Sequence, residues 1–143
     1  MEIKEATNYR QSITSLLSSE KLPVDDLPAS LDNFIVAIQN YDVIGAAGLE
    51  VYGDYGLLRS LAVSPALRGQ GIANELLQQI ETLAGSKGLK SIFLLTETAP
   101  EYFDRKNYTK ITRADVPAEV QQSSEFSYAC PQTAIVMKKT LST

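Results

Sequence analysis

Short apolar runs separated by polar turns characterise the first half of this chain. Alternating or continuous apolar character predicts four strands, at residues 2–6, 34–38, 43–52 and 57–63. Turn-forming residues occupy 39–42 and 53–56, between the last three of these strands. Strands joined by such short turns are expected to form an antiparallel meander.

A helix is predicted between the first two strands. Ile13, Leu16 and Leu17 share one helical face, and Thr7 or Asn8 can cap the first turn. The polar stretch that follows contains two prolines and is expected to be mostly loop.

The second half of the chain alternates helices with strands. Helical periodicity is strongest at residues 70–86, where six apolar side chains form one stripe: Ile72, Leu76, Leu77, Ile80, Leu83 and Ala84. Gly85 or Gly88 is expected to end this helix, and Gly88 is the better C-terminal signal. The apolar run 91–95 predicts a strand buried on both faces. The remaining expected elements are a helix at 99–106 and strands at 108–112 and 133–139.

This order predicts a single α/β (α+β) domain over residues 1–143, with a mixed, mostly antiparallel sheet of about six or seven strands and helices on both faces. A hydrophobic content of 44% and a charged content of 21% are ordinary for a globular protein. The chain is long enough for one substantial core.

Charge and composition narrow the classes of function. A net charge of −4 does not suggest a nucleic-acid-binding surface, and the apolar runs are too short to span a bilayer. A single cysteine permits no internal disulfide, which fits a cytoplasmic location. The chain has no histidine, so a catalytic base must be a carboxylate, tyrosine, cysteine or water, and no metal site is expected.

The glycine-containing stretch 68–73, Arg-Gly-Gln-Gly-Ile-Ala, stands where the fourth strand gives way to the long helix. Glycines let the backbone turn tightly and approach a ligand without a Cβ in the way. The first helical turn offers N–H groups and a dipole that favours an anion, and Arg68 adds a positive charge. The stretch is therefore a candidate pyrophosphate cradle, although glycines at such a turn can also serve geometry alone.

The surrounding residues carry a family resemblance. The strand Leu-Leu-Arg-Ser-Leu-Ala-Val at 57–63, then Ser64-Pro65, the Arg-x-x-Gly-x-Ala pattern and Leu76-Leu77 closely resemble the acetyl-CoA-binding core of the GNAT N-acetyltransferases. The resemblance implies a GNAT fold with splayed central strands and acetyl-CoA as cosubstrate. It implies that the end of the strand lies beside the pantetheine arm and the loop around the pyrophosphate. The residues implied are Leu61, Ala62, Val63, Arg68, Gly69, Gln70, Gly71, Ile72, Ala73 and Asn74.

Acyl transfer to an amine needs a group that removes the amine's proton. Glu50 lies on the third strand, and Arg59 and Ser60 lie near the start of the fourth, across a hairpin. We expect Glu50 to take the proton directly or through a water, and Arg59 to hold a substrate carboxylate bidentately beside Ser60. The alternative is that Glu50 and Arg59 form a cross-strand ion pair. A carboxylate is a poor base at neutral pH, so the catalytic role would require burial or a water relay.

The leaving thiolate benefits from a proton donor. Many GNAT members carry Tyr-x-x-x-Gly-Phe, with the tyrosine near the CoA sulfur, but here Phe103 stands for the tyrosine and Asn107 for the glycine. Asn107 is expected to adopt a left-handed conformation. Tyr102 or Thr96, with Thr98 as a further hydroxyl, is the candidate acid, and the alternative for Tyr102 is a packing role.

The later part of the chain narrows the resemblance. LLTETAPEYFDRKNY at 94–108 is similar to the acetyltransferase domain of N-acetylglutamate synthases. Continued through Glu125-Phe126 and Cys130-Pro131, the pattern resembles the arsenic-resistance subgroup of GNAT proteins. It implies a glutamate-like amino acid, or a toxic mimic, as acceptor. Cys130 is either an arsenic ligand or, as a lone thiol before proline, a buried small hydrophobe.

The predicted function is N-acetyltransfer from acetyl-CoA to the amino group of a small molecule, by direct attack in a ternary complex. No cysteine or serine stands in a recognisable nucleophile setting. Two alternatives stay open: acetylation of a protein or peptide amine, and a regulator that binds acyl-CoA without catalysis. No nucleic-acid or membrane partner is expected, and a homodimer stays open.

Overall fold

The computed structural model of the chain describes residues 1–126 and 134–141. Its strands are β1 (Glu2–Glu5), β2 (Phe34–Gln39), β3 (Asp42–Tyr52), β4 (Tyr55–Val63), β5 (Ser91–Thr96), β6 (Thr109–Ile111) and β7 (Ile135–Thr140). Its α-helices include α1 (Arg10–Ser19), α2 (Ile72–Ser86), α3 (Pro100–Arg105) and α4 (Ala118–Gln121). Short 3₁₀ turns stand at Thr7–Tyr9, Pro65–Leu67 and Arg113–Asp115.

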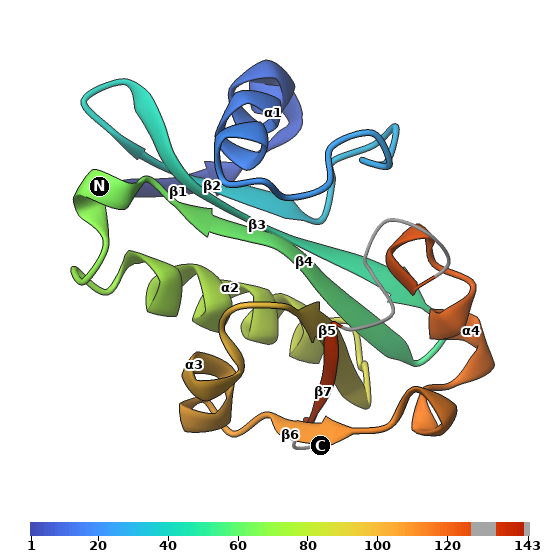
Figure 1. Cartoon of the computed structure of the whole chain (residues 1–143). Coiled ribbons are helices and arrows are strands. Elements are labelled where there is room, and N and C mark those ends of the chain that lie inside the picture. Colours follow the sequence, from blue (N-terminus) through green and yellow to red (C-terminus); the bar gives the residue numbers. More distant parts are fainter. Residues whose placement is uncertain (127–133, 142–143) are drawn as a thin grey trace. The chain divides into compact units, whose positions relative to one another are not determined.

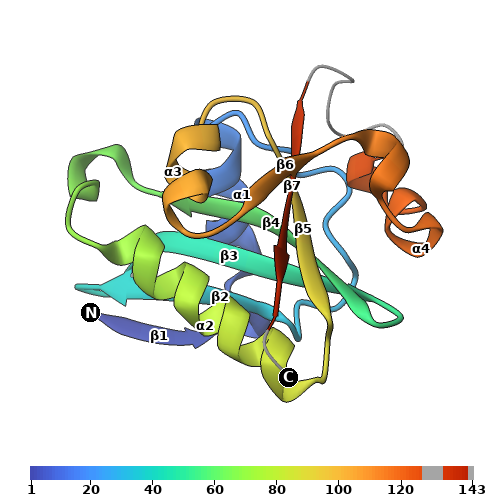
Figure 2. The same ribbon diagram turned by 90° about the horizontal axis from the view of Figure 1, so that it is seen from below.

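The seven strands form one sheet in the order β1-β2-β3-β4-β5-β7-β6 (Figures 1 and 2). β1–β2, β2–β3, β5–β7 and β6–β7 pair antiparallel, whereas β4 and β5 pair in parallel. The predicted mixed, mostly antiparallel sheet is therefore confirmed. By their contacts, the residues divide into two compact units, 1–49 with 59–83 and 50–58 with 84–143. We call them unit 1 and unit 2 and describe each by itself.

In unit 1, α1 covers one face of the first strands (Figure 1). Its predicted apolar positions do face the core, with Ile13 and Leu17 fully enclosed. They belong to one buried cluster drawn from the residue after β1, α1, the following loop and β2 to β4: Ala6, Ile13, Leu16, Leu17, Leu31, Phe34, Val36, Ala46 and Ala62. Burial of this apolar surface is what holds the helix on the sheet.

α2 lies on the opposite face of the unit 1 strands (Figure 1). It approaches β3 closely at Gly45, where a Cβ atom would stand 3.0 Å from the Leu76 side chain and 3.4 Å from that of Ile72. Gly45 and Ala46 are adjacent on β3, so alternation sends one toward α2 and the other toward α1. The small residue lets the first half of α2 pack tightly and so places the helix N-terminus.

The start of α1 corrects one expectation. Neither Thr7 nor Asn8 caps the helix: both lie in a 3₁₀ turn, and Tyr9 occupies the N-cap position without a side-chain hydrogen bond. The chain leaves β1 directly into this turn, in which the Tyr9 amide donates to the Ala6 carbonyl at 2.8 Å. The backbone itself thus satisfies a group that a polar cap would otherwise satisfy.

Left-handed residues after α1, α2 and α3 end these helices in the same way. Lys21, Gly88 and Asn107 have φ of +60°, +73° and +73°. After α1, the Leu22 amide donates to Leu17 and the Lys21 amide to Ser18, the bonding of a Schellman motif. The predictions for Gly88 and Asn107 are confirmed, whereas lysine gives no signal for this conformation.

Unit 2 is built on β5, with β7 between β5 and β6 (Figure 2). The nearly continuous burial of β5 confirms the prediction from its apolar run. The segment around α4 adds apolar side chains to a second buried cluster: Leu57, Phe93, Val116, Val120, Phe126 and Val136. Elsewhere in unit 2, Phe103 and Tyr108 stack edge-to-face at 5.7 Å between ring centroids, which holds α3 to the residue that precedes β6.

Candidate cofactor and acceptor site

The loop between β4 and α2 has the backbone geometry that its glycines predicted. β4 ends at Val63, a 3₁₀ turn occupies Pro65–Leu67, and α2 begins at Ile72. Gly69 and Gly71 both have φ of +82°, a left-handed conformation that costs a residue with a Cβ about 1–2 kcal/mol. The two glycines therefore make the tight turn from strand to helix.

The space above the loop is open on the side of the glycines. A Cβ built at Gly69 or Gly71 would meet no heavy atom within 4 Å. The Gly71 carbonyl accepts the first helical hydrogen bond, from Glu75 at 3.1 Å, so Gly71 stands at the N-cap and the amides after it form the unbonded first turn. These amides and the positive end of a 15-residue helix fit a pyrophosphate group.

Arg68 lies beside this loop, and a carboxylate is already bound to it. Its Nε donates to the Val63 carbonyl at 3.4 Å, and its Nη2 forms an ion pair with Glu20, the residue that ends α1. The Arg68 side chain is 58% exposed and Glu20 is 15% exposed. The guanidinium is therefore accessible to an anion in the loop, although it pairs with an acid of the chain itself.

The second half of β4 carries the residues expected beside the pantetheine arm. Ala62 and Val63 are buried, and Leu61 is half-buried. The described ladder to β5 uses only Tyr55–Leu57 of β4, so the backbone of residues 61–63 lies beyond this ladder. Such backbone groups can bond to an amide-bearing ligand.

Ser60 interrupts β4 with a φ of +61°, which is uncommon for a residue with a side chain. The residue is buried and its hydroxyl accepts a hydrogen bond from the Nε of Arg59 at 3.1 Å. A left-handed residue inside a strand marks a bulge-like break in the pleat. Nothing in the amino-acid pattern indicated this break, because serine has no preference for the conformation.

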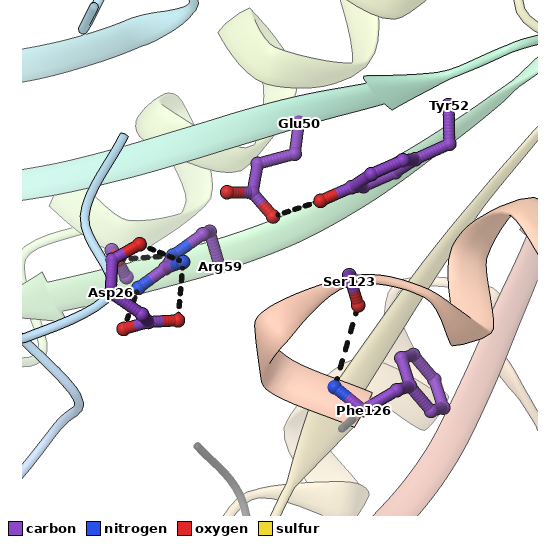
Figure 3. A network of polar contacts seen from close by, with 7 residues as sticks. Asp26, Glu50, Tyr52, Arg59, Ser123 and Phe126 are labelled. Carbon is purple, nitrogen blue, oxygen red and sulfur yellow. Dashed lines mark hydrogen bonds and ion pairs between the residues drawn. The ribbon is translucent and has the colours of Figure 1, made fainter. Parts of the chain in front are cut away.

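Arg59 is bound by a carboxylate that the sequence did not point to. Its Nη1 and Nη2 donate to the two carboxylate oxygens of Asp26 at 2.8 and 2.9 Å (Figure 3). The Arg59 side chain is fully buried and that of Asp26 is 2% exposed. The Arg59 guanidinium, predicted to hold a substrate carboxylate, is thus bound bidentately by Asp26 of the same unit. Asp26 belongs to the polar stretch expected to be loop, where no periodicity marks a buried acid.

Glu50 accepts a hydrogen bond from its neighbour on the same strand face. The Tyr52 hydroxyl donates to Glu50 Oε1 at 2.9 Å (Figure 3). The spacing of two residues puts both side chains on one face of β3, because side chains alternate between the two faces of a strand. Glu50 is half-buried. One carboxylate oxygen is oriented by the phenol, which sequence reasoning did not foresee.

The two candidates for the acid lie around α3, within unit 2. The Thr96 hydroxyl accepts a hydrogen bond from the Ala99 amide at 3.1 Å and so supports the turn before the helix. The Tyr102 hydroxyl oxygen is buried, and its ring stacks edge-to-face on Phe103 at 5.2 Å between centroids. The packing role is thus observed for Tyr102, and a role for either residue as acid stays a prediction.

Two further expectations concern metals and the cysteine. Among residues 1–126 and 134–141, no group of three or more histidine, cysteine or acidic side chains could hold a metal ion. Cys130 lies outside the described residues, as does Pro131. In the same described ranges, the helices are all too short or too polar to cross a membrane.

Comparison with protein families decides the class. Residues 6–110 match the Acetyltransferase (GNAT) family, a span that contains β2, β3, β4, the glycine loop and α2. The chain belongs to the GNAT family. The predicted membership of this family is therefore confirmed.

Sequence relatives of this GNAT chain are named for amino-acid acetylation. An amino-acid acetyltransferase of Mycobacterium tuberculosis is 38% identical over 80 residues, which cover 54% of this chain and 45% of the relative. Another, from Pseudomonas fluorescens, is 33% identical over 94 residues, covering 64% of this chain and 22% of the relative. The chain thus spans less than half the length of these curated relatives.

Solved structures share the fold over nearly the whole chain. Rv2747 from Mycobacterium tuberculosis, crystallised with CoA and NLQ, has a TM-score of 0.84 and 26% identity, with 99% of this chain and 100% of that chain covered. N-acetylglutamate synthase from Neisseria gonorrhoeae, solved with CoA and N-acetyl-glutamate, has a TM-score of 0.81 at 16% identity and is covered over 35% of its length. The second likeness concerns the fold alone.

Proposed function

We propose that this chain transfers the acetyl group of acetyl-CoA to the amino group of a small, glutamate-like amino acid. The observation that carries the proposal is the open, glycine-lined loop at the N-terminus of α2, with Arg68 beside it. The acceptor class is supported by the names of the relatives, which are amino-acid acetyltransferases. We further propose that residues 1–143 act as one GNAT domain.

The residues proposed for the cofactor fall into two groups. Residues 61–63 of β4 bond through their backbone to the pantetheine arm, and residues 68–74 surround the pyrophosphate. In the second group, Gly69, Gly71 and the first-turn amides provide donors and space, and Arg68 provides charge. Acetyl-CoA, when bound, supplies the activated acyl group.

In the proposed reaction, the acceptor nitrogen forms a bond to the acetyl carbon while the carbon–sulfur bond breaks. The nitrogen loses a proton and the thiolate gains one. Glu50 receives the amine's proton, directly or through a water, with the oxygen that Tyr52 does not orient. Tyr102 or Thr96 supplies the proton to the thiolate.

Arg59 can recognise the acceptor carboxylate only under one condition. Because Asp26 occupies both terminal nitrogens, a substrate carboxylate can bind bidentately only if Asp26 gives up its place. Arg59 and Ser60 stay our candidates for the acceptor side on this condition. A glutamate whose α-carboxylate is replaced by a carboxamide tests it without altering the protein.

The experiment is a thiol-release assay with acetyl-CoA and a panel of amines. The panel contains glutamate, its α-carboxamide, other amino acids, phosphinothricin-like and arsenic-bearing mimics, polyamines and basic peptides. Turnover confined to glutamate and its mimics is the expected result. Turnover on peptides alone would instead support a protein acetyltransferase, and turnover on the α-carboxamide equal to that on glutamate would contradict a carboxylate-binding role for Arg59.

A regulator that binds acyl-CoA without catalysis is the other candidate, favoured by the absence of the usual tyrosine at Phe103. It predicts tight binding of acetyl-CoA and no thiol release with any amine of the panel. Calorimetric titration of acetyl-CoA alongside the assay separates these two outcomes.

A further inference from the structure

Both arginines expected to bind ligand anions are paired with acids of one segment. The α1–β2 segment, residues 20–33, connects α1 to β2 and lies entirely within unit 1. Glu20 at its start pairs with Arg68, and Asp26 pairs with Arg59 (Figure 3). The same short segment thus supplies the carboxylate for each of the two guanidinium groups.

The two pairs differ strongly in how easily an incoming anion can replace the carboxylate. The side chains of Asp26 and Arg59 are both buried and joined by two parallel hydrogen bonds, so separating them breaks a buried bidentate ion pair at a high cost in free energy. In the other pair Arg68 is 58% exposed and Glu20 is 15% exposed, so solvent reaches the guanidinium, and ion pairs screened by solvent contribute little to stability. An anion in the glycine loop can therefore take Arg68 from Glu20 at small cost, whereas Arg59 stays paired.

Glu20 lies at the C-terminal end of α1, where its negative charge is unfavourable and Arg68 compensates it. Glu20 is the C-cap of α1, where the helix dipole is negative and disfavours an acid. The last turn of α1 contains no basic residue. The Schellman bonds of Lys21 and Leu22 fix the backbone at this point, so the carboxylate is held at the helix end.

We propose that Glu20 is an internal competitor for the pyrophosphate of the cofactor and so determines the affinity for acetyl-CoA. Without ligand, Glu20 occupies Arg68. A bound pyrophosphate, which carries more charge and more acceptor oxygens than a carboxylate, takes the guanidinium in its place. The α1–β2 segment is then released at Glu20 but stays attached through Asp26. This inference rests on the proposed role of Arg68 in binding the pyrophosphate.

The test is a calorimetric titration of CoA into wild type, Glu20→Gln, Arg68→Gln and the double variant. Glu20→Gln is expected to bind CoA about two- to five-fold more tightly, since an exposed pair of this strength no longer competes. In the Arg68→Gln background the same change is expected to have no effect. Glu5→Gln, which removes an exposed acid of β1 in the same unit, is the matched control for the change in net charge.

Pantetheine, which lacks the pyrophosphate, is the second probe. Its affinity is expected to be the same for wild type and Glu20→Gln. The proposal is overturned if Glu20→Gln leaves CoA binding unchanged or weakens it, if Glu5→Gln matches its effect, or if the gain persists without Arg68. Failure of CoA to bind wild type and all variants would overturn the proposed function as well, whereas tight binding that ignores Glu20 overturns only this inference.

Discussion

The buried pair of Asp26 and Arg59 makes a quantitative prediction about stability. Asp26→Asn preserves the shape of the side chain but removes the negative charge that bonds bidentately to the fully buried guanidinium. Removal of one partner of such a pair costs about 3–5 kcal/mol, and burial means that solvent screening does not reduce the figure. At about 4 °C per kcal/mol for a chain of this size, the expected fall in Tm is about 12–20 °C.

The assay is thermal and urea unfolding followed by circular dichroism, with two controls. Glu2→Gln removes the exposed pair with Lys4, whose side chains are 72% and 50% exposed, and is expected to cost less than about 0.5 kcal/mol. Replacing both buried partners, as Asp26→Leu with Arg59→Met, removes the charge together with its partner and is expected to recover most of the loss.

A loss of about 1 kcal/mol or less for Asp26→Asn, close to the loss for Glu2→Gln, would refute this reasoning. It would mean that water reaches the guanidinium once the carboxylate is neutral. The reasoning would also be refuted if the double variant Asp26→Leu with Arg59→Met were as unstable as Asp26→Asn. The loss of stability would then come from packing and not from charge.

Further predictions concern the loop and the chemistry. Gly71→Ala is expected to destabilise the fold by about 1–2 kcal/mol, because Gly71 has a φ of +82°, and to weaken CoA binding. Gly85 has equally open space around its Cα but lies inside α2, so Gly85→Ala is expected to stabilise the fold by about 0.5–1 kcal/mol. Equal effects of the two substitutions in unfolding experiments would show that φ is not the cause. Glu50→Gln is expected to lower kcat at least tenfold, and unchanged activity across the pH range would exclude Glu50 as the base. Tyr102→Phe is expected to lower kcat without changing acetyl-CoA affinity if Tyr102 protonates the thiolate, and full turnover in stopped-flow assays would leave Thr96 as the candidate.

Local sequence signals were sufficient for most of the fold. The alternation of β3, the apolar run of β5 and the stripe of α2 each depend on neighbouring positions only, so the pattern identifies them. Gly69 and Gly71 were recognisable for the same reason: a residue without a Cβ is favoured where φ is positive. The GNAT family could be inferred because this loop and the strand before it are contiguous in the chain.

Two left-handed residues that are neither glycine nor asparagine were not predicted from the sequence pattern. Lys21 ends α1 and Ser60 breaks β4, both with positive φ, although neither residue type prefers that conformation. At each position the surrounding bonds impose the geometry: Schellman bonds at Lys21, and burial beside Arg59 at Ser60. Thr7 and Asn8 show the opposite case: both are residue types that favour the N-cap, but neither caps α1, because backbone hydrogen bonds already satisfy the turn before the helix.

The sequence by itself determined most of the secondary structure, the geometry of the glycine loop and the family, because these depend on residue preferences over short stretches. Only the tertiary structure decided which acids meet Arg59 and Arg68. Asp26 and Glu20 are separated from these arginines by 33 and 48 positions. A pairing across such a separation depends on how α1 and its following loop pack on β4, and burial then determines which pair is strong. Neither quantity is a property of any short stretch of chain.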